Sequence, residues 1–308
     1  MSGTTVVNAY AAHEARGELT PLQFELPPIG PEDVDIAVEY CGVCHSDLSM
    51  LNNEWYATQY PFVPGHEVIG TIAAVGEQVK NMAVGDKVGL GWFSHSCMRC
   101  NNCMTGDHNL CAEKQMTIMG RHGGFADRVR CHWAWAVPLP DSLDQASAGP
   151  LFCAGATVFN PLVQFDVQPT DHVGVIGIGG LGHLALQFLN KWGCEVVAFT
   201  SSPDKAEEAR RMGAHRVVNS REPKELSSIA GSLNFVLNTT DVTLNWEAYV
   251  GALAGKGRLH TVGMVAEPMA VSAVGLVSGQ KSLSGSPMSS PASNRKMLEF
   301  CARHSIAP

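Results

Sequence analysis

Four cysteines of this chain lie close enough in the sequence to bind one metal ion together. Gaps of two, two and seven residues separate Cys97, Cys100, Cys103 and Cys111. Four thiolates at such spacing can converge on one tetrahedral ion, and zinc is the usual occupant. Because four protein ligands leave no position for a substrate, we expect this zinc to brace a loop and to take no part in a reaction. A pair of disulfides or a redox switch is the less favoured alternative, since nothing else in the chain indicates an oxidising compartment.

A second set of possible ligands is dispersed along the chain. Cys44 lies in the segment Cys41-Gly-Val-Cys44-His45, which matches the attachment motif of c-type haem and could also be a redox pair. In a third interpretation Cys44 is a metal ligand, together with the imidazole of His66, the carboxylate of Glu67 and the thiolate of Cys153. Spacing alone does not show that these residues meet, and a cysteine such as Cys153, taken singly, is more often a small buried core residue.

A glycine-rich segment indicates a nucleotide site. Gly177, Gly179 and Gly182 stand in the order of the dinucleotide-binding fingerprint. In that fingerprint the first glycine permits a tight turn, the second lets the backbone approach a pyrophosphate, and the third lets the helix pack on the strand. A predicted strand precedes the segment and a predicted helix follows it, which is the context that the motif requires. A glycine-rich turn between packed elements is the alternative.

The end of the next predicted strand indicates which cofactor binds. An NAD site usually has a carboxylate there for the ribose 2′-hydroxyl. This chain has Thr200, Ser201 and Ser202, with Lys205 shortly after. Hydroxyl groups and a lysine can hold a 2′-phosphate that a carboxylate would repel, so we predict NADP(H). Ser202 could also cap the following helix, and the two roles are compatible.

These residues need two kinds of supporting structure. Up to about residue 150 the sequence is rich in short strands, such as the alternating apolar and polar residues 34–40, with frequent proline and glycine. Beyond it, strands alternate with helices, which indicates a parallel sheet covered on both faces. We expect strands at residues 68–75, 84–88, 171–176, 195–200, 216–218, 235–237 and 258–262, helices at 181–192, 204–212 and 294–304, and a return towards the first domain at 281–290.

The bulk composition argues against some classes of function. With 308 residues the chain has room for two domains, and its hydrophobic content of 45% can fill two cores. The formal net charge of −8 argues against nucleic acid or an anionic membrane as the main partner. The first residues show no basic stretch followed by an apolar core, and the most apolar stretch, 173–189, is interrupted by glycines. We therefore expect a soluble cytoplasmic protein, which also counts against haem attachment.

Taken together, these motifs resemble those of one enzyme family. The chain is similar to zinc-dependent medium-chain alcohol dehydrogenases. Within them it resembles the cinnamyl-alcohol-dehydrogenase-like branch, and there the bacterial NADPH-dependent aldehyde reductases of broad substrate range. The segments that carry the resemblance extend over nearly the whole chain and are residues 41–48, 64–70, 97–111, 150–157 and 175–182.

The resemblance implies an α/β protein with two domains. Residues 1–150 would form a GroES-like catalytic domain, a partly open β-barrel with a structural zinc lobe at residues 92–112. Residues 151–288 would form a Rossmann NADP-binding domain with a doubly wound parallel sheet. Residues 289–308 would return to the catalytic domain. Family members usually continue further, so we expect the C-terminal closing strands of the barrel to be missing from this chain.

The resemblance also implies roles for single residues. Cys44, His66 and Cys153 would hold a catalytic zinc, so that the chain carries two zinc ions, and Glu67 would ligate that zinc transiently. Ser46 would hydrogen-bond the reacting oxygen. Contacts to the cofactor are implied at His45, Thr157, Gly177, Gly179, Gly180, Leu181, Gly182, Thr200, Ser201, Ser202, Lys205, Thr239 and Val262.

The implied activity is the reversible, NADPH-dependent reduction of aldehydes to primary alcohols, with hydride passing from the nicotinamide to a zinc-polarised carbonyl. Asp47 would orient His66 for metal binding. Many relatives have a histidine at the position of Ser49, so the last proton step here runs through water or by another route. Trp55 and Trp92, with Tyr60, could line an apolar substrate pocket or pack in a core.

Two further expectations concern partners and the competing function. The resemblance implies a homodimer that forms through the edge of the Rossmann sheet. The alternative to an enzyme is a non-catalytic NADPH-binding protein or a cysteine redox sensor, which would bind the cofactor without turning over aldehydes.

Overall fold

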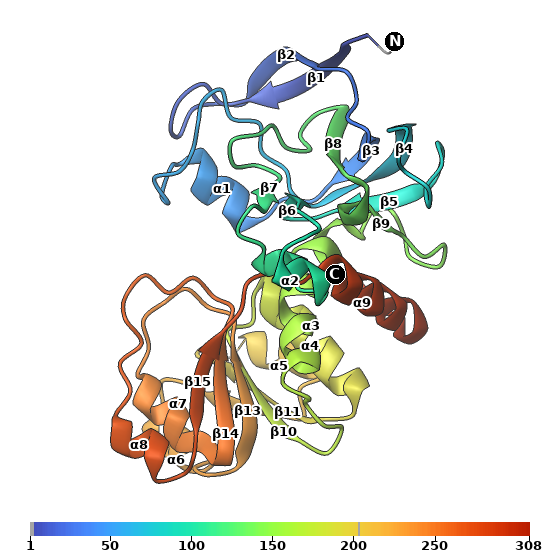
Figure 1. The fold of residues 1–308 in the computed structure, drawn as a ribbon. Helices are drawn as coiled ribbons and strands as arrows, with labels where there is room; N and C mark the ends of the chain where they lie inside the picture. The colour runs from blue at the N-terminus through green and yellow to red at the C-terminus, as the bar shows by residue number, and fades with distance from the viewer. Residues whose placement is uncertain (1–2, 203) are drawn as a thin grey trace. The chain divides into compact units, whose positions relative to one another are not determined.

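The chain divides into two compact units in the computed structural model, which describes residues 3–202 and 204–308. Unit 1 comprises Met1–Ala156 and Ser289–Ala307, and unit 2 comprises Thr157–Met288 together with Pro308. Figure 1 shows the elements of each unit, coloured along the chain. Among the described residues, no helix has the length and apolar character needed to cross a membrane.

Unit 1 is built on an antiparallel sheet with the strand order β8-β3-β4-β5-β9. A hairpin and a second, shorter strand pair accompany this sheet (Figure 1). Residues of the first hairpin strand alternate between buried and exposed, as in a strand with one face on a core. The strands are β1 (Thr5–Ala11), β2 (Thr20–Leu26), β3 (Asp33–Cys41), β4 (Val68–Val75), β5 (Lys87–Leu90), β6 (Phe93–His95), β7 (Gln115–Met116), β8 (Arg128–His132) and β9 (Val137–Pro138).

Short helices connect these strands, and one longer helix returns the chain to unit 1. The short ones are α1 (His45–Leu51), α2 (Asn101–Met104) and the 3-10 helices η1 (His108–Leu110), η2 (Trp133–Trp135) and η3 (Gly149–Phe152). The returning helix is α9 (Pro291–His304), which contacts β9 and begins three residues before the predicted start. The side chain of Ser290 caps it by accepting the N–H of Ser293.

Unit 2 is a six-stranded parallel sheet with the order β12-β11-β10-β13-β14-β15, which is the strand order of a Rossmann fold. Strands β10 and β11 of this sheet are buried along almost their whole length, as expected for strands covered on both faces. The strands are β10 (His172–Ile176), β11 (Glu195–Thr200), β12 (Arg216–Asn219), β13 (Leu233–Asn238), β14 (Leu253–Thr261) and β15 (Ser282–Gly285).

Helices alternate with these strands. They are α3 (Ala154–Gln164), whose first three residues belong to unit 1, α4 (Gly180–Trp192), α5 (Asp204–Arg211), α6 (Pro223–Ser227), α7 (Trp246–Ala252) and α8 (Ala273–Val277). α4 packs on β10 and β11 and ends at Gly193, whose φ of 106° is the left-handed conformation that glycine adopts most easily. Phe199 and Tyr249 belong to the core between the sheet and α7.

The fold class predicted from the sequence is confirmed, although several predicted elements differ in their ends and one segment differs in its role. Residues 282–285 lie within the segment 281–290 that we expected to lead back to the first domain. They instead form β15, which pairs in parallel with β14. The short sequence Ser-Leu-Ser-Gly lacks the apolar run of a buried strand, so its conformation depends on the neighbouring strand. The strand predicted at residues 84–88 begins at Lys87, because residues 84–85 form a turn.

Candidate active site

Four of the predicted ligands, from distant parts of the sequence, meet within unit 1. The ligand atoms of Cys44, His66, Glu67 and Cys153 all lie within 4.8 Å of one another. Nε2 of His66 is 3.2 Å from Sγ of Cys153, and the Sγ atoms of Cys44 and Cys153 are 3.9 Å apart. His66 and Glu67 are buried, and the two cysteines are half-buried. Two thiols, an imidazole and a carboxylate are therefore within reach of a single ion.

Pairing of β3 with β4 brings the first three of these residues together. Cys44 follows β3 and is the N-cap residue of α1, whereas His66 and Glu67 lead into β4. The two strands are antiparallel, and Cys41 is paired with Val68 at their ends. The N–H of Gly42 donates to the carbonyl oxygen of Glu67 at 2.9 Å, which extends the pairing into both ligand segments.

Two glycines permit the close approach of the backbone around Glu67. A Cβ on Gly42 would collide with the carboxylate of Glu67, and a Cβ on Gly149 would lie 2.7 Å from the carbonyl oxygen of Glu67. Gly149 is the first residue of η3, and Cys153 follows that helix directly. The missing side chain at residue 149 therefore lets η3 pack beside Glu67, which carries Cys153 to His66.

The carboxylate of Asp47 accepts hydrogen bonds from both segments that carry the ligands. Its Oδ1 accepts hydrogen bonds from Nδ1 of His66 at 2.9 Å and from the N–H of Gly65 at 2.8 Å, and its Oδ2 accepts the N–H of Cys44 at 3.1 Å. Asp47 is buried in the first turn of α1. With Nδ1 of His66 donating to Asp47, Nε2 is the ring nitrogen that faces the two thiols, and it becomes a metal ligand when a bound cation displaces its proton. One carboxylate thus fixes both ligand segments and the orientation of the ring.

The pKa values of the two thiols at this site are shifted in opposite directions. Their mutual hydrogen bond lowers the pKa of Cys44 to about 4 although burial opposes this, and the same bond, together with burial, raises the pKa of Cys153 well above its usual value. Burial lowers the pKa of His66, but its hydrogen bonds to Asp47 and Cys44 outweigh burial and raise the pKa to about 10. A thiolate at Cys44 is the form that binds metal.

Glu67 indicates that a cation suits this cluster. Its Oε2 is buried without any hydrogen-bond partner among the described residues, and burial raises the pKa of its carboxyl to about 7. A buried carboxylate oxygen without a donor is costly, and a metal ion is one group that satisfies it. The set of two thiols, one imidazole and one carboxylate oxygen suits zinc.

The four cysteines of the second cluster also converge. The Sγ atoms of Cys97, Cys100, Cys103 and Cys111 lie within 4.8 Å of one another. The N–H of Cys100 points at Sγ of Cys97 at 3.3 Å, and the N–H of Cys97 points at Sγ of Cys111 at 3.4 Å. Donation from the backbone N–H groups of Arg99 and Cys100 lowers the pKa of Cys97 to about 7. These donors favour thiolates, as a four-sulfur zinc site requires.

In unit 2 the glycine-rich segment forms the turn between β10 and α4. Gly177 has a φ of 86°, in the left-handed region that favours glycine. A Cβ on Gly182 would collide with the carbonyl oxygen of Gly177, whereas Gly179 and Gly180 have open space beside them. The turn is therefore compact on the side of the strand and open at the N-terminus of α4, where backbone N–H groups can receive a pyrophosphate. The residues present fit a dinucleotide.

Comparisons with known proteins identify the family of this chain. The model of the Alcohol dehydrogenase GroES-like domain matches residues 30–141, and that of the Zinc-binding dehydrogenase family matches residues 180–303. The chain is 52% identical to Aldehyde reductase AdhA of Synechocystis sp. over 303 residues, which are 98% of this chain and 90% of that protein. The chain belongs to the zinc-dependent medium-chain alcohol dehydrogenases.

Two solved structures place this dehydrogenase near the cinnamyl alcohol dehydrogenases. A cinnamyl alcohol dehydrogenase (SbCAD4) from Sorghum bicolor has a TM-score of 0.93 and 34% identity, covering 98% of this chain and 89% of that one. The CAD from Helicobacter pylori, solved as a complex with NADP(H), has a TM-score of 0.90 and 28% identity, covering 99% and 90%. The family resemblance inferred from the motifs is therefore confirmed.

The remaining predicted cofactor residues of this dehydrogenase lie at several places. Thr239 and Val262 follow β13 and β14, and the hydroxyl of Thr239 donates to the carbonyl oxygen of Gly177 at 2.7 Å. Thr157 lies in α3 in unit 2, and His45 is the exposed first residue of α1 in unit 1. Ser46 follows it in α1, and its N–H donates to the thiol of Cys44.

Of the four residues expected to hold a 2′-phosphate, three line the same cavity and the fourth does not. Thr200, Ser201 and Ser202 line one cavity of about 210 Å³. Lys205 is not among the described residues that line it, and its Nζ donates to the carbonyl oxygen of Ile178 in the glycine turn at 3.1 Å. Arg210 lines the cavity and was not predicted. It lies one helical turn beyond Ala206, another lining residue, and that spacing on one helix face was the available signal.

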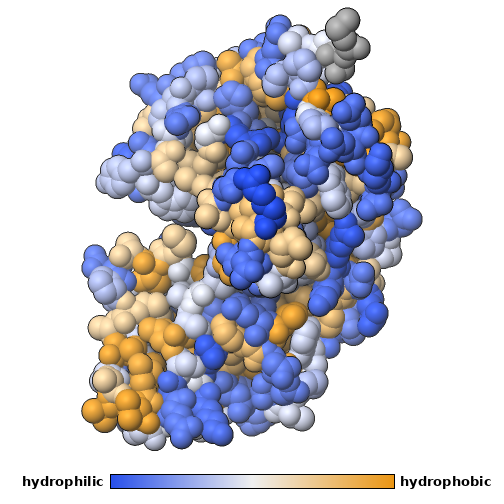
Figure 2. Space-filling model, in the orientation of Figure 1, coloured by the Kyte–Doolittle hydropathy of each residue, from blue (hydrophilic) through white to orange (hydrophobic). Residues whose placement is uncertain are grey.

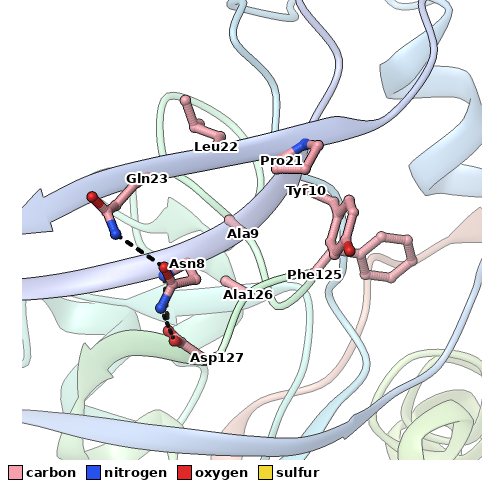
Figure 3. A pocket seen from close by; sticks show the side chains of 9 residues that line it. All are labelled: Asn8, Ala9, Tyr10, Pro21, Leu22, Gln23, Phe125, Ala126 and Asp127. Carbon is pink, nitrogen blue, oxygen red and sulfur yellow. Dashed lines mark hydrogen bonds between the residues drawn. The ribbon is translucent and has the colours of Figure 1, made fainter.

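A larger cavity lies elsewhere in unit 1. It measures about 710 Å³ and is formed by the β1–β2 hairpin and residues 125–127 (Figure 3). Its polar side chains bond to one another, since Gln23 donates to Asn8 at 3.1 Å and Asn8 donates to Asp127 at 2.7 Å. None of the predicted site residues is among the described residues that line it. We assign it no part in the site.

Proposed function

We propose that this chain catalyses the reversible, NADPH-dependent reduction of aldehydes to primary alcohols. The observation that carries the proposal is the convergence of Cys44, His66 and Cys153 in a chain that also has an open dinucleotide turn. The name of the relative from Synechocystis sp., an aldehyde reductase, supports the substrate class. The Helicobacter pylori relative, solved with NADP(H), supports the cofactor.

In this proposal Cys44, His66 and Cys153 would hold the catalytic zinc, and Glu67 would offer it a carboxylate oxygen. Bound zinc supplies a Lewis acid that polarises a carbonyl group, and NADPH supplies the hydride. Asp47 keeps the proton of His66 on Nδ1 and so keeps Nε2 available as a ligand atom. The hydroxyl of Ser46 hydrogen-bonds the substrate oxygen and holds a proton there.

The side chains around His66 favour substrates with an apolar body. The ring of Trp92 meets the ring of His66 edge-on with centroids 4.9 Å apart, and Trp55 meets Trp92 in the same manner at 5.9 Å. Both tryptophans pack with Tyr60 against the buried cluster of Met50, Phe62 and Ile118. Aromatic side chains that line a substrate site bind aliphatic chains and rings, and we propose that the partly buried rings of Trp55 and Trp92 do so here. We therefore include long aliphatic and aromatic aldehydes in the proposed substrate class.

The proposal includes a homodimer that forms through β15. This strand is at the edge of the six-stranded sheet, and an edge strand can pair with its copy across a twofold axis. On α8, Val274 and Val277 are each 77% exposed, and Figure 2 shows apolar side chains gathered in that region of unit 2.

Sedimentation should give twice the chain mass, and Val277→Glu should shift the distribution towards monomer. A monomeric wild-type protein would contradict this part.

The activity is tested by following NADPH oxidation with aldehydes of graded length and aromaticity. We expect turnover that rises from short aldehydes to longer aliphatic and aromatic ones, and that requires zinc. A ketone series with the same carbon skeletons is the control for general carbonyl reduction. NADPH binding without turnover of any aldehyde would contradict the proposal and would favour a non-catalytic cofactor-binding protein.

A further inference from the structure

A small cavity in unit 2 lies at the carboxyl ends of β11 and β12. It measures about 210 Å³, and its lining includes Thr200 at the end of β11, Ser201 after it, and Asn219 at the end of β12. Two charged residues of opposite sign also line it, Arg210 on α5 and Glu225 on α6. In Rossmann folds the end of the second strand meets the adenosine ribose, so the 2′ substituent of the cofactor belongs here.

Arg210 is suited to bind a phosphate in this cavity. Its side chain is half exposed, and its Nη1 forms an ion pair with Glu207 at 2.7 Å, one turn earlier on α5. That pair uses one nitrogen of the guanidinium group, which carries five donors in a planar fork that matches phosphate geometry. Arg210 is the only lysine or arginine among the described residues that line the cavity. Lys205 does not line it, and its Nζ donates to the carbonyl oxygen of Ile178 in the glycine turn instead.

Glu225 has the opposite effect on the same ligand. Its Oε2 accepts the N–H of Asn219 at 2.7 Å, which fixes the carboxylate at the end of β12. A carboxylate there repels a 2′-phosphate and can accept a hydrogen bond from a free 2′-hydroxyl. The cavity therefore contains one group that favours the phosphorylated cofactor and one that favours the unphosphorylated cofactor.

We propose that Arg210 and Glu225 together set the preference between NADPH and NADH, with Arg210 binding the 2′-phosphate and Glu225 limiting how strongly the phosphorylated cofactor is preferred. The proposal rests on the function proposed above and adds two residues that the sequence pattern did not predict. Thr200, Ser201 and Ser202 supply hydroxyl groups to either cofactor, so the charge balance decides the discrimination.

The test is equilibrium binding of NADPH and NADH, measured by isothermal titration calorimetry on the full chain without substrate. Arg210→Ala should weaken NADPH binding about 10-fold or more, the range of a charge-assisted hydrogen bond, and change NADH binding less than about twofold. Arg210→Lys should restore part of the loss. Glu225→Gln keeps an acceptor for the N–H of Asn219 and should tighten NADPH binding about threefold while NADH binding stays the same or weakens.

Neighbouring residues of equal charge provide matched controls. Arg211 is exposed on α5 and Glu222 is exposed before α6, and neither lines the cavity. Arg211→Ala and Glu222→Gln should leave both affinities within about twofold, because exposed charges outside the cavity are largely screened. If Arg211→Ala weakens NADPH as much as Arg210→Ala does, the effect is one of net charge and the proposal is wrong.

The remaining outcomes separate this proposal from the function on which it rests. A wild-type chain that binds NADPH no better than NADH contradicts the proposed cofactor itself. A wild-type chain that prefers NADPH, with the preference unchanged in Arg210→Ala, contradicts only the role of Arg210. Equal weakening of both cofactors in Arg210→Ala indicates a damaged helix and also contradicts that role.

Discussion

Oδ1 of Asp47 lies 2.9 Å from Nδ1 of His66, and the same oxygen accepts the N–H of Gly65 at 2.8 Å. A single buried atom therefore orients the imidazole and also fixes the backbone that carries it. This contact is the reason why His66 presents Nε2 to the thiols of Cys44 and Cys153.

Replacing Asp47 should loosen the catalytic zinc. Asp47→Ala removes the acceptor for His66 Nδ1 and for two backbone N–H groups, so we expect zinc affinity at this site to fall about 10- to 100-fold. Titration with a chelator measures the loss. The four-cysteine zinc in the same molecule is the internal control and should be retained. Chelator resistance equal to that of the wild type at both sites would show that Asp47 does not position His66.

Removing one thiol should separate catalysis from cofactor binding. Cys153→Ala deletes a ligand, so we expect loss of one of two zinc ions and of aldehyde reduction, with unchanged NADPH binding. Metal analysis and calorimetry measure the two effects. Cys301→Ala is the matched control, because Cys301 is a buried cysteine on α9 outside both clusters. Normal turnover by Cys153→Ala would refute the ligand assignment.

The four-cysteine cluster should contribute to stability. Cys100→Ser should lower the zinc content to about one ion per chain. A loss of about 2 kcal/mol would lower the melting temperature of a unit of this size by roughly 4–8 °C. Scanning calorimetry with metal analysis checks this, and Cys194→Ser, a buried cysteine of unit 2, serves as the control. The assignment would be wrong if Cys100→Ser kept two zinc ions.

Gly42 should not tolerate a side chain. A Cβ at residue 42 collides with the carboxylate of Glu67, so Gly42→Ala should destabilise the chain by about 1–3 kcal/mol and reduce turnover. Gly251→Ala is the control, since a Cβ there meets nothing within 4 Å and the residue lies in α7. That variant should be neutral or more stable by up to about 1 kcal/mol. Denaturation in urea gives both values, and equal results for the two variants would contradict the packing argument.

His260 should make the stability of unit 2 sensitive to acid. It is fully buried, its two ring nitrogens lie 2.9 Å from the hydroxyls of Ser284 and Ser286, and burial, together with the charge of Arg258, lowers its pKa to about 4. The unfolded chain binds this proton near 6.5, the ordinary pKa of histidine, so the unfolded state holds more protons between pH 6.5 and pH 4. Stability should therefore fall through that window as the pH is lowered, by about 3 kcal/mol in total from this residue.

Comparison of His260→Gln with the wild type isolates this contribution. Zinc ligands also take up protons in acid, but they do so in both proteins, so the difference between their urea midpoints reports His260 alone. The slope of stability against pH between 6.5 and 4 should be smaller in the variant. His13→Gln, at an exposed residue, should keep the wild-type slope. Parallel slopes in His260→Gln and the wild type would show that His260 is protonated in the folded chain.

The local features of this protein were determined by its sequence. The four cysteines span few residues, so short loops suffice to bring their sulfur atoms together. The glycine turn was predictable because each glycine is needed for a local conformation or a close backbone contact between one strand and the next helix. The strand at residues 195–200 was predicted with its observed ends, because a continuous apolar run buried on both faces leaves a clear pattern.

The tertiary structure alone decided the contacts between segments far apart in the chain. Cys44 and Cys153 are separated by 109 positions, and they meet because β3 pairs with β4 and because Gly149 lets η3 approach Glu67. Arg210 and Glu225 share a cavity because β11 and β12 are neighbours in the sheet. Such contacts depend on strand pairing and backbone packing, which involve interactions over long separations that spacing within one segment does not encode.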